Sequence, residues 1–66
     1  MTIEQIRTAL ADVEQSFSIA MDNGAESLAM AILAKRDQLW NELVQRIQAM
    51  DPYTTEADIR YFEHNN

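Results

Sequence analysis

The chain has 66 residues, no cysteine and a formal charge of -6 at pH 7. That size leaves room for one small domain, 1–66, and excludes an elaborate catalytic cleft. Hydrophobic residues make up 47% of the chain and charged residues 24%, which is typical of a globular protein. One glycine and one proline are too few for the many turns of a β-protein, so the composition predicts an all-α fold.

The small size also predicts association with another chain. A domain near 60 residues buries only about 60% of its extended-chain surface, so such domains usually need a further source of stability. The lack of cysteine excludes disulfides and thiolate metal sites, and a single histidine, His64, excludes a His-rich zinc site. We therefore expect the chain to bind a protein partner and also itself, as a homodimeric bundle.

Two kinds of partner are disfavoured. No stretch approaches the roughly 18–20 consecutive apolar residues of a membrane span, and Met1 is followed by polar Thr2 and Glu4, not by a basic and apolar leader. A pI near 4.4 argues against direct binding to DNA, RNA or anionic membranes. We expect a cytoplasmic protein that contacts neither membrane nor nucleic acid.

The first predicted helix spans about 2–22. Thr2 and Gln5 match the capping box that begins many helices. Apolar residues then recur in steps of three and four, the spacing of a seam that lies along one partner helix. They are Ile3, Ile6, Leu10, Val13, Phe17 and Ala20. Gly24 suits the left-handed residue that ends a helix, and we expect Asp22 or Asn23 to cap the next one.

The second predicted helix spans about 25–50 and pairs with the first as an antiparallel hairpin. At 100° per residue its apolar side chains cover an arc of about 160°, wider than the roughly 100° that faces one neighbour. The side of this arc from Leu28 to Leu43 should face the first helix. The surplus apolar residues are Leu33, Trp40 and Val44. They need a second covering surface.

A short third helix is predicted over about 54–64. Asp51 and Pro52 end the second helix, because a residue before proline is pushed out of helical geometry. Thr54 or Thr55 can cap the new helix. Because about ten residues do not hold as a helix alone in water, we expect this one to dock at the open end of the hairpin. The residues there are Ile3, Leu43 and Ile47.

The sequence offers no candidate for catalysis, metal binding or a cofactor. Glu63 and His64 are metal-ligating types, but they are adjacent and close to a terminus, where solvation is the ordinary fate. The serines have no histidine within reach, and Gly24 alone cannot form a phosphate-binding loop. We expect a protein that is not an enzyme and binds neither metal nor cofactor.

Two features of the second helix have alternative interpretations. Trp40, with the other surplus residues, is either an anchor for a partner or core beneath the third helix, and we favour the anchor. Arg36 falls within the apolar arc and belongs to the same candidate surface. It either pairs with Glu14 or Asp12, within the chain or across a dimer, or lays its aliphatic stem on apolar surface with its charge in water.

Methionine and acidic residues also have two interpretations each. Met21, Met30 and Met50 could line an adaptable groove, but we expect them to fill gaps in the core. The acidic residues of the third helix could imitate nucleic-acid phosphates, although a solvated surface is the plainer explanation. This possible mimic face consists of Glu56, Asp58 and Glu63.

In length, acidity and helical-hairpin plan, the chain resembles the small dimeric bundles of the Rop plasmid-regulator type. It shares no motif with them and lacks their basic RNA-reading face. Small phage-borne inhibitors of bacterial defence systems, anti-CRISPR proteins among them, are similar in size and acidity. These resemblances are compositional, so they carry over no site residues and assign no family.

The sequence therefore predicts a non-enzymatic protein–protein interaction module, a small inhibitor or regulator that binds and occludes a larger protein. The predicted partner-binding residues are Leu33, Arg36, Trp40, Val44, Tyr61 and Phe62, with Tyr53 beside the last two. One alternative is an acidic inhibitor of a nuclease or defence system that acts through the mimic face. Another is a structural or chaperone subunit of a larger assembly.

Overall fold

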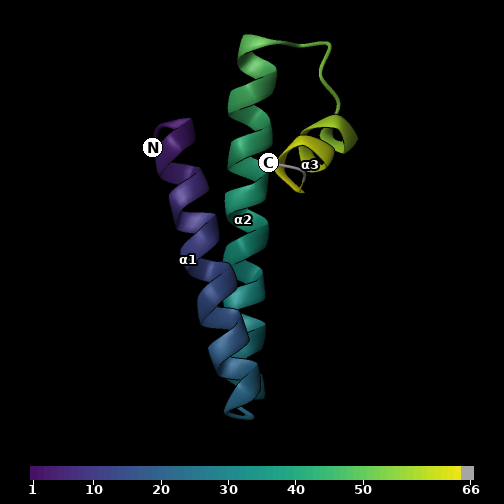
Figure 1. Ribbon diagram of the computed structural model, residues 1–66. Helices are drawn as coiled ribbons and strands as arrows, with labels where there is room; N and C mark the ends of the chain where they lie inside the picture. The colour runs from purple at the N-terminus through teal and green to yellow at the C-terminus, as the bar shows by residue number, and fades with distance from the viewer. Residues whose placement is uncertain (65–66) are drawn as a thin grey trace.

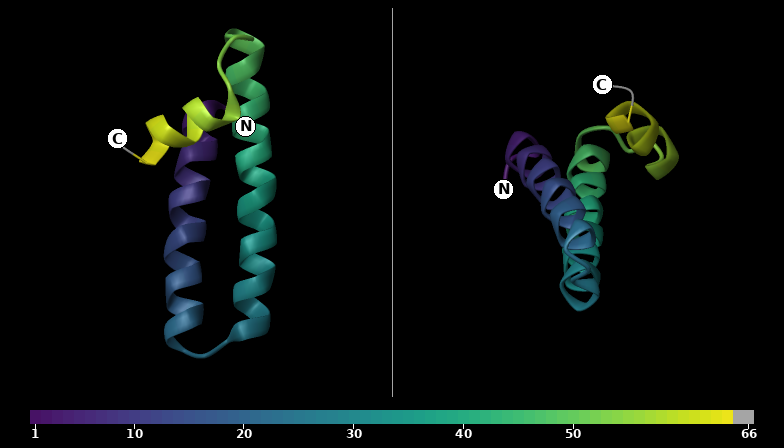
Figure 2. Two further views of the ribbon diagram at one scale, coloured as in Figure 1. Left: turned by 90° about the vertical axis from the view of Figure 1, so that its right-hand side faces the viewer. Right: turned by 60° about the horizontal axis from the view of Figure 1, so that its bottom comes forward.

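A computed structural model describes residues 1–64 and contains three helices: α1 (Ile3–Asp22), α2 (Glu26–Met50) and α3 (Glu56–His64). Helices α1 and α2 pack antiparallel as a hairpin, and α3 lies beside the end where α1 begins and α2 ends (Figures 1 and 2). The molecule is elongated, with extents of 41 × 22 × 17 Å. The predicted all-α hairpin with a short third helix is confirmed, with boundaries within two residues of those expected.

The predicted capping box at the start of α1 is present. The Thr2 hydroxyl accepts a 3.1 Å hydrogen bond from the Gln5 amide, and the Gln5 side chain accepts one of 2.9 Å from the Thr2 amide. At the start of α3, the Thr55 hydroxyl accepts a 3.2 Å bond from the amide of Asp58. These bonds satisfy amides that have no partner inside the first turn. Local sequence therefore fixes where both helices begin.

The turn between α1 and α2 closes on Gly24, whose φ of 70° favours glycine. The Gly24 amide donates to the Met21 carbonyl and the Ala25 amide to the Ala20 carbonyl, the two bonds of a Schellman motif. The expectation that Asp22 or Asn23 caps α2 is wrong: the N-cap is Ala25, with no side-chain hydrogen bond. Asp22 is the last residue of α1 and Asn23 is its C-cap. Both residues therefore lie too early in the chain to cap α2.

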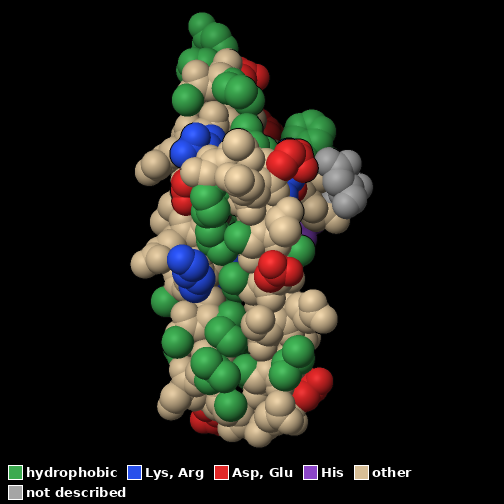
Figure 3. All heavy atoms as spheres, turned by 90° about the vertical axis from the view of Figure 1, so that its left-hand side faces the viewer, with side chains coloured by type: hydrophobic (Ala, Val, Ile, Leu, Met, Phe, Trp, Pro, Cys, Tyr) green, Lys and Arg blue, Asp and Glu red, His purple; other side chains and the backbone are tan. Residues whose placement is uncertain are grey.

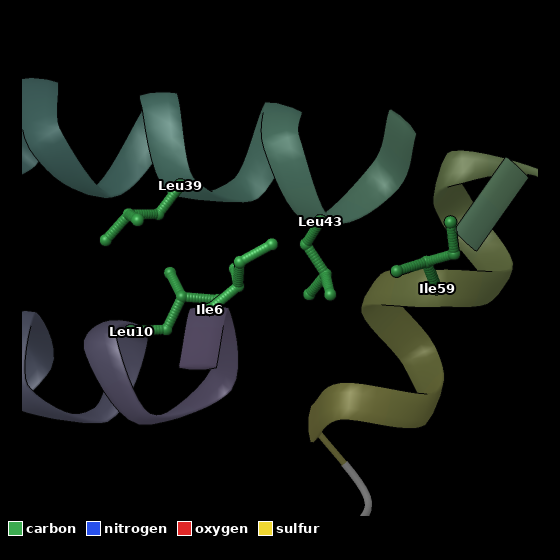
Figure 4. Close-up of a cluster of buried hydrophobic side chains, with 5 residues drawn as sticks. All are labelled: Ile6, Leu10, Leu39, Leu43 and Ile59. Atoms are coloured by element: carbon green, nitrogen blue, oxygen red, sulfur yellow. The ribbon is translucent and has the colours of Figure 1, made fainter. Parts of the chain in front are cut away.

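The core lies at the open end of the hairpin, where all three helices meet (Figure 4). Its buried side chains are Ile6, Leu10, Leu39, Leu43 and Ile59. Leu43 and Ile6 are completely buried, and Ile59 is the buried residue of α3. Ile3 and Ile47 pack against this cluster, as predicted for the docking site of the third helix. Toward the turn, the buried residues are only Ala20 and Ala29, so the core thins out there.

The thin core at the turn corrects two expectations. Leu28 was expected to face α1, yet it is 56% exposed. It precedes the buried Ala29, so it points about 100° away around the helix, beyond the strip that α1 covers. Met21, Met30 and Met50 were expected in the core, but all three are more than half exposed. Alanines close the hairpin near the turn, and α3 covers only the open end.

Candidate functional site

Helix α3 is held on the hairpin by an apolar contact, a cation–π contact and a charged hydrogen bond. Ile59 enters the core, and the Arg60 guanidinium lies 5.2 Å from the ring centre of Trp40, within the range of a cation–π interaction. Arg7 of α1 donates a 2.9 Å hydrogen bond to the Glu63 carboxylate. In the connection before α3, the Gln48 side chain donates to the Thr54 carbonyl at 3.2 Å. These contacts fix the face that α3 turns outward.

Arg7 joins α1 to α3 and also to its own helix. Its Nε donates to Glu63 and its Nη1 to Glu4, each at 2.9 Å. The hydrogen bond that Arg7 donates to Glu63 raises the pKa of the Arg7 guanidinium above its ordinary value, with smaller contributions from the charges of both carboxylates. A raised pKa means that the positive charge is fully present at every pH below the ordinary arginine pKa. Arg7, which links α1 to α3, therefore stays positively charged throughout the physiological pH range.

The structure divides the surplus residues of α2 into two places. Trp40 and Val44 are half-buried and pack against the core cluster next to α3, while Leu33 lies nearer the turn. Trp40 also borders a small hollow of about 280 Å³ that includes Leu10 and Glu63. The third helix thus supplies part of the covering surface that the wide apolar arc requires. Part of the indole stays accessible at the edge of α3.

Arg36 pairs inside the chain with one of its two expected partners. Its Nη1 lies 3.6 Å from the Glu14 carboxylate across the α1–α2 interface, and its side chain is 33% exposed. This geometry matches an ion pair at the border of the apolar strip. A half-buried charge so placed is satisfied without any second chain.

The other two predicted residues, Tyr61 and Phe62, are exposed side chains of α3. They are 66% and 61% exposed, and their rings meet edge to face at a centroid distance of 6.1 Å. Phe62 borders a groove of about 570 Å³ between the three helices, here called the open-end groove. Its apolar lining consists of Ile3, Ile47, Met50, Ile59 and Phe62, and its polar lining of Glu4, Arg7, Thr54 and Glu63. The volume lies in the range of sites that bind small molecules or protruding side chains.

The residues of the possible mimic face are engaged within the chain. Glu56 pairs with Arg60 at 3.0 Å, and Glu63 pairs with Arg7 at 2.9 Å. Asp58 takes part in the cap at the start of α3, where its side chain accepts a 3.4 Å bond from the Thr55 amide. Two of the three carboxylates therefore have an arginine beside them, which reduces the negative potential that they present to a partner.

Sequence reasoning missed two grooves that flank the hairpin near its turn. One, here called the uncharged groove, has about 410 Å³ and a lining that includes Ser16, Ile19, Ala20, Ala25, Leu28 and Ile32. The other, here called the methionine groove, has about 310 Å³ and is lined by Phe17, Met21, Glu26, Ala29, Met30 and Leu33. A signal was present in the sequence: between Gln15 and Ala34 only Asp22 and Glu26 are charged.

Within residues 1–64, no three His, Asp or Glu side chains are grouped so that they could hold a metal ion. None of the three helices combines the length and the apolar character needed to cross a membrane. Comparison with known proteins found no matching family, no similar curated protein and no similar solved structure.

The Arg7–Glu63 pair leads to a prediction about the third helix. Changing Glu63 to Gln should speed hydrogen exchange in α3 about two- to fivefold, because a partly exposed ion pair stabilises only modestly. Glu56→Gln is the matched control, since it removes the pairing with Arg60 inside α3 and leaves the link between helices intact. Equal exchange rates in the two variants would show that Arg7 does not hold α3.

Proposed function

We propose that this chain is a non-enzymatic interaction module, an inhibitor or regulator that binds a larger protein and occludes part of its surface. The observation that carries the proposal is the exposure of the neighbouring rings of Tyr61 and Phe62, of which Phe62 borders the open-end groove. Exposed aromatic side chains next to an apolar hollow are typical of the residues that dominate binding energy at protein interfaces.

The composition of the open-end groove supports this proposal. Its apolar centre is bordered by charged and polar side chains, the pattern of a protein interface with a desolvated middle and a solvated rim. Phe62 sits on a helix whose position is set by buried Ile59 and by the Arg7–Glu63 pair. A side chain held in place before binding loses less conformational entropy when the complex forms.

The predicted anchors on α2 have a secondary place in this proposal. The exposed edge of Trp40 lies near α3 and could extend the binding surface from Phe62 toward the middle of the hairpin. Leu33 lines the methionine groove and is separate from that surface. Phe62 is also the better residue to mutate, because Trp40 packs against the core and its removal would change stability together with binding.

The proposal is tested by first isolating the protein that co-purifies with the tagged chain from its native host. Phe62→Ala should then weaken binding to that protein at least tenfold in a calorimetric titration, because hot-spot aromatics typically contribute that much. Met30→Ala removes an equally exposed apolar side chain from the methionine groove and should bind like the wild type. Far-UV circular dichroism should be the same for all three proteins.

Salt dependence separates this proposal from phosphate mimicry. An apolar interface should change little with ionic strength, whereas binding through the mimic face should weaken steeply as salt is added. The proposal would be wrong if Phe62→Ala bound normally while the amide replacements of Glu56, Asp58 and Glu63 abolished binding. That pattern would identify the acidic face as the binding surface.

A further inference from the structure

The uncharged groove lies on the edge of the hairpin away from α3. Figure 3 looks at this side and shows hydrophobic side chains gathered over both helices toward the turn. Leu28 and Ile19 stand out from the groove, 56% and 54% exposed, while Ala20 and Ala25 provide small side chains in its lining. The surface therefore combines protruding apolar side chains with a hollow of about 410 Å³ beside them.

The distribution of charge indicates what can cover this groove. With a net charge of -6, two copies of the chain repel each other over most of their surfaces. The lining of the uncharged groove contains no Asp, Glu, Lys or Arg, and the nearby stretch from Gln15 to Ala34 has only Asp22 and Glu26. Two copies that meet here bring no like charges of the two groove linings into direct contact, and such contacts would otherwise cost binding energy.

The chain as a whole also exposes more surface than a compact monomer of its size. The chain exposes 4854 Å², whereas a compact monomer of 7.6 kDa is expected to expose about 4300 Å². This excess of the whole elongated chain, about 550 Å², is comparable with the roughly 600 Å² that each partner contributes to the smallest specific interfaces. Interfaces at the small end of this range are typical of weak, transient association.

We propose that two copies of this chain associate through their uncharged grooves to form a symmetric homodimer. A twofold axis places the same surface on both copies, so the surface must fit itself. The groove meets this requirement, because Leu28 of one copy can enter the hollow above Ala20 and Ala25 of the other. The pair would build a four-helix arrangement at the turn ends, where each hairpin alone has only a thin alanine core. Self-association here is independent of the proposed partner binding, which uses the opposite end of the molecule.

The test is sedimentation velocity of the full chain over a concentration series. The wild type should pass from monomer to dimer in the micromolar range, and Leu28→Glu should raise the dissociation constant at least tenfold. Glu is a good helix former, and near the start of α2 its negative charge favours the helix, so this variant should keep its circular dichroism spectrum. Ile19→Glu alters the same groove from α1 and should have the same effect.

Met30→Glu is the matched control, because it adds the same charge to the same helix but lies in the methionine groove. It should dimerise like the wild type. A wild type that stays monomeric at millimolar concentration would overturn the proposal. So would a Leu28→Glu variant that still dimerises, or a Met30→Glu variant that dissociates equally, since the latter would show that total charge or another surface controls association.

Discussion

Replacing Leu43 with alanine should leave most of the chain unfolded at room temperature. Leu43 is completely buried in the cluster where α1, α2 and α3 meet. A buried Leu→Ala change typically costs about 2–5 kcal/mol, because the transfer free energy of the lost methyl groups is joined by the cost of a cavity. A single core of this size seldom supplies more than roughly 3–5 kcal/mol, so one such substitution removes most of the stability.

The free energy of unfolding from urea titrations, followed by far-UV circular dichroism, measures this effect. Met30→Ala deletes a side chain of similar volume from a 66% exposed position and should change stability by less than about 0.5 kcal/mol. If Leu43→Ala folded with nearly wild-type stability, the cluster at the open end would not be the main source of stability. The stabilising packing would then have to lie elsewhere, at the turn end or in a dimer interface.

The helices of this chain were predictable because their signals are local. The Thr2–Gln5 capping box, the glycine at position 24 and the Asp51–Pro52 break each act within a few residues. The apolar steps of three and four in α1 require only helical periodicity, and that seam does contain the buried residues Ile6 and Leu10. Pairing of Arg36 with Glu14 was one of the alternatives that helix register left open, since an antiparallel hairpin of known turn fixes which levels face each other, and the structure shows this pair.

The exposure of the apolar residues could not be derived in the same way. Whether Leu28 is buried depends on the width of the strip that α1 covers, which small residues such as Ala20 and Ala29 set. Whether Trp40 is covered depends on where α3 packs against the hairpin after the five-residue connection from α2. Both are decided by packing between elements, for which a single sequence carries no periodic signal.

The same reason explains which parts of the candidate site were missed. Arg7 and Glu63 are 56 positions apart, and nothing near either residue indicates their pairing. The open-end groove exists only because α3 stands beside α1 and α2 and leaves space between them. In contrast, Tyr61 and Phe62 were predicted from sequence as partner-binding residues, and both are exposed, because a short helix with one buried residue leaves its other large side chains outside the core. Their binding role stays a prediction.

Replacing Ile59 with alanine should release α3 while α1 and α2 stay folded, a result qualitatively different from that of Leu43→Ala. Ile59 is the buried side chain of α3, 2% exposed, and the other contacts of this helix are partly exposed charged groups. A nine-residue helix is not stable unless it packs on another surface, so the residues of α3 should lose helical structure once the apolar contact with the hairpin weakens. We expect the loss to be limited to the docking free energy of α3, because the other members of the cluster, Ile6, Leu10, Leu39 and Leu43, all belong to α1 and α2.

Hydrogen exchange resolved by residue distinguishes the two outcomes. In Ile59→Ala the amides of 56–64 should exchange near the rates of an unfolded chain, while those around Ile6 and Leu39 remain protected. Trp40 fluorescence should shift to the red, since the indole loses the cover of Arg60. Tyr53→Ala, at a 93% exposed position just before α3, should leave exchange unchanged. Loss of protection in all three helices together would mean that α3 is an integral part of the core. The helix that carries Phe62 would then be unable to unfold independently of the hairpin.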